Sequence, residues 1–372
     1  MSSDTVKVFE HTTSGGYVVA QAELDSQPTL NALSLEMIEL LVPPLARWAR
    51  DPKVAAVVIT GAGERAFCAG GDIQALYRAM QANHQAGERV DDYPYEFFER
   101  EYRLDYRLQT YPKPVVVLGH GVIMGGGLGI FNAADHRVVT ENVRIALPEV
   151  TIGLFPDAGG TWMLKHMPEH HALFVGMTGS NLNAADALAA GLGTHAVARS
   201  DLARILPGLL ELPLAGDPAT DGRLIDEWLD GITPPSLPAP ELPAVADTLH
   251  ADEGFAVAAQ AVRAMAGRSE WVDRGIATME RGCPTTVGIV VEQVRRAHSL
   301  DLADCFRMEM TVATHCADNH DFSEGVRALL IEKDNAPAWQ FGDLDALPEG
   351  YVLDHFVEPW PRNPLYDLEE ST

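Results

Sequence analysis

One stretch restricts the fold more than any other: residues 115–134 carry almost no polar side chain and contain six glycines. The stretch has about the length of a helix that crosses a bilayer. Glycine is a poor helix former, however, and so many glycines, with His120 among them, would leave a membrane helix weakly held. We therefore predict a buried strand, Val115–Leu118, followed by a glycine turn and a buried helix. The glycines are Gly119, Gly121, Gly125, Gly126, Gly127 and Gly129.

A second strand with a glycine turn lies earlier in the chain. Val54–Thr60 is an apolar run typical of a buried strand, and Ala69-Gly70-Gly71-Asp72 follows it closely. If a helix begins near Asp72, the amides of the two glycines are unpaired N–H donors that point outward. Such donors can stabilise a developing oxyanion. The alternative is a plain glycine turn capped by Asp72, and the residues alone favour that alternative.

The intervening segment Gly61–Ala66 loosely matches the G-x-G-x-x-A pattern of dinucleotide-binding turns. A true fingerprint opens a helix, with an acid about twenty residues further on. Here the chain runs directly into the next glycine turn. We therefore predict a surface loop over Gly61–Arg65.

Two acids stand eight positions apart in the segment Leu147–Gly160, which otherwise consists mostly of apolar residues, Gly and Pro. A carboxylate in apolar surroundings has a shifted pKa or a bonded partner, and such groups gather at active sites. Glu149 and Asp157 are therefore candidates. Alternatively, Asp157 caps a helix and Glu149 lies on a solvated turn; the residues alone favour the cap and leave Glu149 open. One N–H donor from each glycine turn, converging near Glu149, would form a two-amide oxyanion hole.

The rest of the chain supplies a strand first and mainly helices later. Tyr17–Leu24 is typical of a strand, and Ser34 can cap a helix that Pro43-Pro44 would kink or split. Residues 81–96 are polar and acidic, and predict an insertion over the surface before an amphipathic helix, Phe97–Leu108. We place the boundary between a core, residues 1–200, and a helical region, residues 201–372, near residue 200.

The formal net charge of −26 argues against two classes of partner. Nucleic acid and an anionic membrane surface both attract basic proteins. The four cysteines lie far apart without C-x-x-C spacing, which predicts neither a disulfide framework nor a zinc site and fits a reducing compartment. The first residues resemble neither a signal peptide nor an Arg-rich transit peptide, so we expect a cytoplasmic protein.

Several short motifs together resemble the enoyl-CoA hydratase/isomerase (crotonase) superfamily. The shared motifs are Ala66–Asp72, Gly125–Gly127 and Pro148-Glu149 with Gly159-Gly160-Thr161. Within the superfamily the chain is similar to the branch of hydrolases that cleave 3-hydroxyisobutyryl-CoA, through Tyr111–Pro114, Ile152–Asp157 and Phe322–Asp334. The resemblance extends from about Tyr17 to Phe356. It implies an α/β fold, a spiral of repeated ββα units followed by a helical C-terminal region.

The resemblance also implies roles for individual residues. In this superfamily the thioester oxygen lies in a hole made by two backbone amides, which match Gly71 and Gly126. Hydratases carry one glutamate shortly after the glycine triplet, where this chain has Gly129, and a second at the position of Glu149. The hydrolases instead pair that second glutamate with an aspartate eight residues on, which Asp157 matches. The resemblance therefore favours Glu149 and Asp157 as catalytic residues.

The function that the resemblance implies is hydrolysis of a small 3-hydroxyacyl-CoA thioester, with the 3-hydroxyisobutyryl-CoA of valine breakdown as expected substrate. Further residues expected at the substrate are Ala69, Gly70, Asp72 and Gly125. No metal or other cofactor is expected, because CoA is part of the substrate, and a homo-oligomer is left open. The alternatives are an enoyl-CoA hydratase or isomerase, and a catalytically silent acyl-CoA-binding protein on the same fold.

Overall fold

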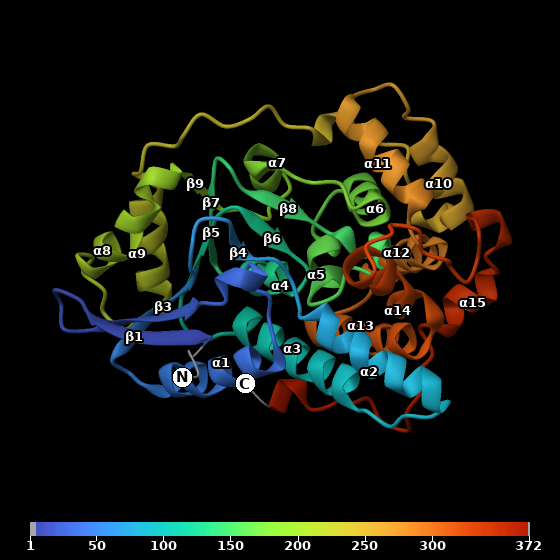
Figure 1. The fold of residues 1–372 in the computed structure, drawn as a ribbon. Helices are drawn as coiled ribbons and strands as arrows, with labels where there is room; N and C mark the ends of the chain where they lie inside the picture. Colours follow the sequence, from blue (N-terminus) through green and yellow to red (C-terminus); the bar gives the residue numbers. More distant parts are fainter. Residues whose placement is uncertain (1–4, 371–372) are drawn as a thin grey trace.

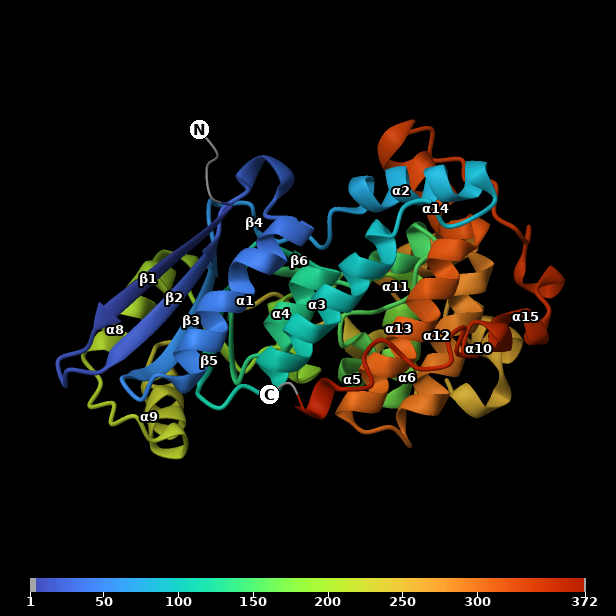
Figure 2. The same ribbon diagram turned by 90° about the horizontal axis from the view of Figure 1, so that it is seen from below.

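A computed structural model describes residues 5–370 of the chain. Strands gather at one end of the molecule and most helices at the other, as the two perpendicular views show (Figure 1; Figure 2). The early part of the chain, blue to green, builds the strand-rich end. The orange and red helices α10 to α15 build the other end.

The larger sheet has six strands in the order β1-β2-β3-β5-β7-β9. The first two strands are antiparallel, and all later neighbours run parallel. Its central strands are apolar and buried, as expected of parallel strands covered on both faces. The strands are β1 (Val6–Thr12), β2 (Val18–Leu24), β3 (Val54–Gly61), β5 (Val115–Gly119), β7 (His136–Thr140) and β9 (His195–Val197).

A smaller parallel sheet has the order β4-β6-β8. Its strands are β4 (Ala66–Cys68), β6 (Val122–Met124) and β8 (Arg144–Ala146). Three successive strand pairs, β3 with β4, β5 with β6 and β7 with β8, each give one strand to either sheet. Helical segments follow each pair, so the predicted spiral of ββα units is confirmed. These helices are α2 (Ile73–Ala86) and α3 (Tyr93–Gln109), then α4 (Gly126–Asn132), then α5 (Gly160–Lys165), α6 (Glu169–Thr178) and α7 (Ala184–Ala189).

The glycine-rich stretch 115–134 folds as predicted into a strand, a turn and a helix. It forms β5, the short strand β6 and the buried helix α4. Among residues 5–370, no helix combines the length and the apolar character that crossing a membrane requires.

Helix α1 (Leu35–Arg50) begins as predicted but is not split. The Ser34 hydroxyl accepts a hydrogen bond from the Met37 N–H at 3.1 Å and caps the helix. One continuous helix then runs through Pro43 and Pro44, so of the two predicted outcomes, a kink or two short helices, the division into two helices is wrong. The helix buries an apolar stripe, and this tertiary packing outweighs the local cost of the prolines. The stripe contains Met37, Ile38, Leu41, Leu45 and Trp48.

Residues 81–96 do not form an insertion. Helix α2 extends to Ala86 and α3 begins at Tyr93, which leaves a short exposed connection between them. The buried side chain of Asn83 fixes this connection, because its oxygen accepts the N–H groups of Val90 and Asp91, both at 2.8 Å. The Asn83 side chain thus holds the short connection in place, and the polar residues on either side of it belong to α2 and α3.

Helices α8 (Ile205–Leu210) and α9 (Pro218–Asp230) cover one face of the larger sheet (Figure 1). Each buries apolar side chains against the strands, and a fully buried side chain of this size contributes about 1.5–3 kcal/mol. The shared cluster includes Val58, Val116, Val138, Ile205, Leu209, Ile225 and Leu229. Both helices lie beyond residue 200, and the boundary predicted there stays a prediction.

The helical end is built around α12 (Pro284–Ala297), which is buried along most of its length and contacts α5, α6, α10 and α15. Helix α13 (Leu302–Asp318) packs against α3 and so joins the helical end to the strand-rich end. The other helices are α10 (Phe255–Arg263), α11 (Glu270–Arg281), α14 (His320–Val326) and α15 (Glu349–Asp354). Helices therefore dominate this part of the chain, as the sequence predicted.

Candidate active site

The two glycine turns and the acidic segment meet at one small cavity. It has a volume of about 80 Å³ and lies between the start of α2, helix α3, the start of α4 and the segment 148–157. The predicted site residues that line it are Ala69, Gly70, Gly71, Gly125, Gly126, Glu149 and Asp157. Asp72 lies outside this lining, and its carboxylate instead accepts the Ala75 N–H at 3.2 Å and caps α2.

Each of the two glycine turns has a backbone N–H group without a backbone acceptor. Gly126 is the first residue of α4, so its N–H has no acceptor within the helix. The bridge that Leu33 makes with the first turn uses the N–H groups of Leu33 and Asp72, and not that of Gly71. Gly125 has φ 49°, which favours glycine at this position. Each turn can therefore offer an amide to a ligand.

The turns touch each other and the Glu149 side chain. A Cβ added to Gly125 would lie 3.3 Å from the Gly70 Cα and 3.8 Å from Glu149 Oε1. A ligand atom that contacts Gly125 would therefore also be close to that carboxylate. The two turns and Glu149 thus lie together, whereas the convergence of one N–H donor from each turn near Glu149 stays a prediction.

Glu149 is a buried carboxyl and does not lie on a solvated turn. It belongs to a short 3-10 helix, Pro148–Thr151, and is only 3% exposed. Its Oε2 has no hydrogen-bond partner among the described residues. Burial, with a smaller contribution from the charge of Asp157, raises the pKa of Glu149 well above its usual value. An unpaired carboxyl of this kind is available for reaction with a ligand.

Asp157 does not cap a helix, although the residues alone favoured that alternative. The N–H groups at the start of α5 donate to another side chain, because Glu309 accepts those of Gly159 at 2.8 Å and Thr161 at 2.7 Å. The Asp157 Oδ2 instead accepts the hydroxyl of Tyr102 at 2.7 Å. Burial raises the pKa of Asp157 to about 6, against the opposing effect of the Tyr102 hydrogen bond.

Helix α3 brings a third acid to the cavity that our sequence analysis missed. Glu101 lines the cavity and lies against the second glycine turn, since a Cβ on Gly126 would be 1.9 Å from Glu101 Oε1. Burial, followed by the charges of Asp157 and Glu309, raises its pKa well above the usual value. A signal was present: Glu101 and Asp105 stand at i and i+4 on the apolar face of a predicted helix.

The buried acids form a group without any cationic partner. Within the described residues, no ion pair joins them to a Lys, Arg or His side chain, so desolvation is not compensated. Burial is accordingly the largest cause of the raised pKa at each of them. The group consists of Glu101, Asp105, Glu149, Asp157 and Glu309.

Comparison with known proteins places the chain in a family. The pattern of the enoyl-CoA hydratase/isomerase family matches residues 19–356. Since this match covers most of the sequence, the chain belongs to that family, and the resemblance inferred from the short motifs is confirmed.

The individual relatives are named for two different activities. The chain is 32% identical over 372 residues to the mitochondrial 3-hydroxyisobutyryl-CoA hydrolase of Gallus gallus, covering 97% of this chain and 93% of that protein. A solved carnitinyl-CoA dehydratase from Mycobacterium thermoresistibile is 30% identical with a TM-score of 0.83, covering 98% and 99% of the two chains. An enoyl-CoA hydratase from Rhodobacter sphaeroides has a TM-score of 0.78 at 28% identity, covering 95% and 97%. The sequence relative is named as a hydrolase, and both structural neighbours are named for adding or removing water.

Proposed function

We propose that this protein hydrolyses the thioester of a small 3-hydroxyacyl-CoA, with 3-hydroxyisobutyryl-CoA as the first candidate and 3-hydroxyisobutyrate and CoA as the products. The observation that carries the proposal is the pair of acids in the cavity, Glu149 beside the glycine turns and Asp157 held by Tyr102. The chicken relative, which bears the name of this activity, supports the choice of substrate.

In the proposed mechanism the amides of Gly71 and Gly126 bind the thioester oxygen and stabilise the tetrahedral oxyanion. Glu149 reacts in its deprotonated form: the carboxylate attacks the carbonyl carbon and expels CoA thiolate, which takes up a proton, and water then hydrolyses the mixed anhydride and regenerates the carboxyl group. Alternatively, Glu149 removes a proton from the water that attacks directly. Asp157 accepts a hydrogen bond from the 3-hydroxyl and thereby selects hydroxylated acyl groups. The reaction needs no cofactor in either version.

Gly129 favours hydrolysis over hydration. It stands where the resemblance places the first glutamate of hydratases. A Cβ at Gly129 would lie 2.7 Å from the Ala158 carbonyl oxygen and 2.8 Å from Asp105 Oδ2, so a glutamate does not fit there. General acid–base groups contribute about 10²–10⁴-fold each, and hydration that lacks one should be very weak.

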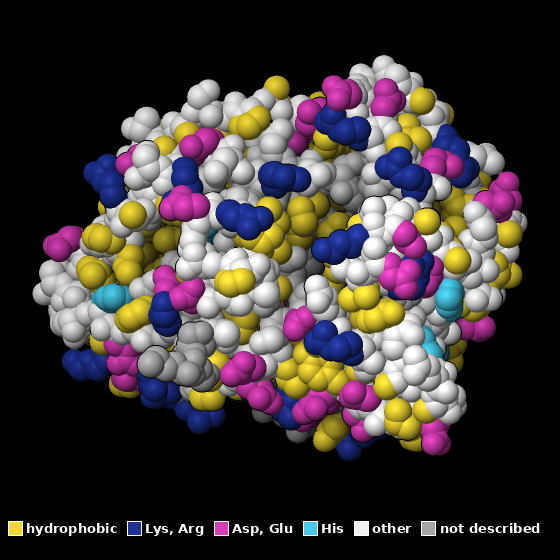
Figure 3. All heavy atoms as spheres, viewed as in Figure 1, with side chains coloured by type: hydrophobic (Ala, Val, Ile, Leu, Met, Phe, Trp, Pro, Cys, Tyr) yellow, Lys and Arg dark blue, Asp and Glu magenta, His cyan; other side chains and the backbone are white. Residues whose placement is uncertain are grey.

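The surface around the middle of the molecule suits a CoA substrate. Figure 3 shows a hollow near the centre of this face, with apolar side chains in it and several Lys and Arg side chains around it. In a chain with a formal net charge of −26, a local group of basic side chains favours the phosphates of CoA. The small cavity favours a short acyl group.

A role in valine breakdown, a cytoplasmic location and self-association into a homo-oligomer stay part of the proposal. Because the chicken relative is named as mitochondrial, a mitochondrial location is the competing expectation.

One pair of assays tests the proposal. Full-length protein is incubated with 3-hydroxyisobutyryl-CoA and a thiol reagent, and in parallel with crotonyl-CoA while the enoyl absorbance is followed. We expect thiol release to be fast and loss of enoyl absorbance to be negligible at equal enzyme concentration. Hydration that matches or exceeds hydrolysis would favour an enoyl-CoA hydratase, as the structural neighbours are named. If neither reaction occurs and acyl-CoA only raises the melting temperature, the protein is a silent binder.

A further inference from the structure

A compact group of imidazole and carboxylate side chains lies on the outer face of the larger sheet. His136 begins β7 and His195 begins β9, and the parallel register pairs His195 with Val138. Since alternate residues of a strand point to the same face, both histidines face the same side. Helix α9 covers that side and brings Asp226 and, one turn later, Asp230.

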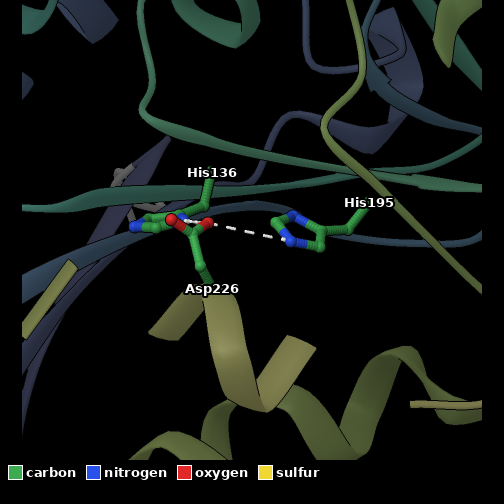
Figure 4. Close-up of side chains that lie close together, drawn as sticks. All are labelled: His136, His195 and Asp226. Atoms are coloured by element: carbon green, nitrogen blue, oxygen red, sulfur yellow. Dashed lines mark hydrogen bonds and ion pairs between the residues drawn. The ribbon is translucent and has the colours of Figure 1, made fainter. Parts of the chain in front are cut away.

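The polar atoms of this group are close enough to share one ion. His136 Nδ1 lies 2.8 Å from Asp226 Oδ1, and His195 Nε2 lies 3.7 Å from the same oxygen. Figure 4 shows the Asp226 carboxylate between the two rings. One ligand atom from each of these three residues lies within 4.8 Å of the others. Asp230 lies outside this group of three, and its Oδ1 is 3.4 Å from His195 Nε2.

Thr194 holds the ring of His195 from the strand side. Its hydroxyl lies 2.9 Å from His195 Nδ1 and accepts the Arg137 N–H at 2.8 Å. Nδ1 therefore has its own partner, and Nε2 is the ring nitrogen that faces Asp226 and Asp230.

In metal sites the second ring nitrogen of a histidine ligand usually has an oxygen partner that fixes the orientation of the ring, and the Thr194 hydroxyl lies at such a position beside His195 Nδ1. The side chain of His136 is only 3% exposed and that of His195 only 9%, whereas the Asp226 side chain is 55% exposed. The two imidazoles are thus held in place, and the carboxylates can adjust.

We propose that His136, His195, Asp226 and Asp230 bind a late first-row transition-metal dication, with Zn²⁺ as the reference ion. Two imidazole nitrogens and two carboxylate oxygens form a common tetrahedral zinc set, and the two carboxylates balance the charge of the ion. Tetrahedral ligand atoms about 2.0–2.2 Å from Zn²⁺ lie roughly 3.3 Å from one another. The side chains of Asp226 and Asp230 are 55% and 76% exposed, so neither carboxylate is locked in place by packing.

The bound ion would clamp α9 to strands β7 and β9. None of its ligands lines the cavity of the candidate active site, so the ion stabilises the fold and takes no part in the hydrolysis. The site is independent of the proposed function. Its ligands come from three separate elements, so no spacing of residues along the chain indicates the site.

Binding is measured on full-length protein without a polyhistidine tag, freed of metal by chelator and desalting. Zn²⁺ is titrated by calorimetry, and Co²⁺ is added separately because its visible absorption distinguishes tetrahedral from octahedral sites. We expect one ion per chain and a tetrahedral Co²⁺ spectrum. At about 100-fold excess of Zn²⁺ over its Kd, the melting temperature should rise by about 3 °C.

Variants decide whether the binding belongs to this site. Asp226→Asn and His195→Gln should weaken binding by more than the roughly 10–100-fold typical of a lost outer-shell partner. Asp226 is half exposed, so its variant should fold, as circular dichroism checks. His250→Ala removes an exposed histidine that pairs with Glu169 at 3.3 Å and should leave binding unchanged. Absence of binding in the wild type, or binding unaffected by Asp226→Asn, would overturn the proposal.

Discussion

Glu149 and Asp157 share one cavity but differ in what each carboxylate contacts. Glu149 has an oxygen without a partner, whereas Asp157 accepts the Tyr102 hydroxyl at 2.7 Å. The hydrogen bond stabilises the charged form of Asp157 and keeps its pKa at about 6, while the pKa of Glu149 lies well above the usual value. Glu149, once deprotonated, has an oxygen free to act as nucleophile or base, whereas the anchored Asp157 suits recognition of a hydroxyl.

For Glu149, the substitution Glu149→Ala should lower kcat for thiol release by at least roughly a hundredfold, because it removes the nucleophile or base. The fold should survive, since the lost carboxyl oxygen has no hydrogen-bond partner to leave unpaired. Thiol release and circular dichroism are measured on the same preparation. A folded variant with turnover near that of the wild type would refute the assignment.

For Asp157, we predict an effect on selectivity. Asp157→Ala should reduce turnover of 3-hydroxyacyl-CoA by about ten- to hundredfold, which corresponds to about 1–3 kcal/mol for an unpaired buried hydroxyl. Plain acyl-CoA, which has no 3-hydroxyl, should be affected far less. Equal losses on both substrates would mean that Asp157 has a structural or general catalytic role.

Tyr102→Phe provides the matched control for Asp157. It removes the hydroxyl that lowers the pKa of Asp157, so this pKa should rise above about 6. Turnover of the 3-hydroxyacyl substrate should therefore fall at mildly acidic pH and recover as the pH rises and Asp157 ionises. A pH-independent loss would indicate that Tyr102 only supports the packing.

At the scale of elements, the start of α4 and the middle of α3 define the cavity together. Gly126 leaves no room for a side chain, because a Cβ there would lie 1.9 Å from Glu101 Oε1 and 3.3 Å from a methyl carbon of Leu33. Gly126→Val should therefore abolish thiol release by displacing Glu101 or blocking the acyl group.

The matched control is Gly350→Ala in α15, where an added Cβ meets nothing within 4 Å. This variant should keep full activity and gain about 0.5–1 kcal/mol of stability from the helix preference of alanine. Normal hydrolysis by folded Gly126→Val would show that the second glycine turn does not border the acyl group.

The elements that the sequence predicted best are those whose signal is local. The apolar run Val54–Thr60 became β3, and Ser34 caps α1 as expected. The errors arose where tertiary packing decided. Pro43-Pro44 stayed inside a helix because one face of that helix is buried, and Asn83 closes a connection that we took for an insertion.

The site was predictable only in part, for a similar reason. Two glycine turns and the Pro148-Glu149 motif are continuous in sequence, and they line one cavity. Residue patterns alone assigned Asp157 to a cap, because the competing acceptor, Glu309, lies about 150 residues away. Glu101 was missed because an acid in an amphipathic helix ordinarily faces solvent. Glu309 gives no local signal, because only the fold brings it to the start of α5.

At the scale of the whole molecule, the buried acids affect the net charge of the folded protein. The formal net charge of −26 treats every acid as ionised. Several acids around α3 and α13 have a raised pKa, Glu309 of about 8 among them, so the folded protein retains protons that the unfolded chain releases. Near neutral pH the net negative charge of the folded protein is therefore smaller than the formal value of −26.

Asp105 offers the clearest test of this linkage. It is 1% exposed, neither of its carboxyl oxygens has a partner among the described residues, and burial with the charges of Glu101 and Glu309 raises its pKa well above the usual value. A group with a higher pKa in the folded than in the unfolded state adds stability below its unfolded pKa of about 3.9, and this stability is lost as pH rises through the folded pKa.

Asp105→Asn cannot titrate, so its melting temperature relative to wild type should improve by about 1–3 °C between about pH 5 and about pH 8. Differential scanning calorimetry measures both proteins at each pH, with Asp247→Asn, at an exposed position, as the matched control. A difference that stays constant with pH, or that moves against the variant, would show that Asp105 is ionised in the folded protein across this range.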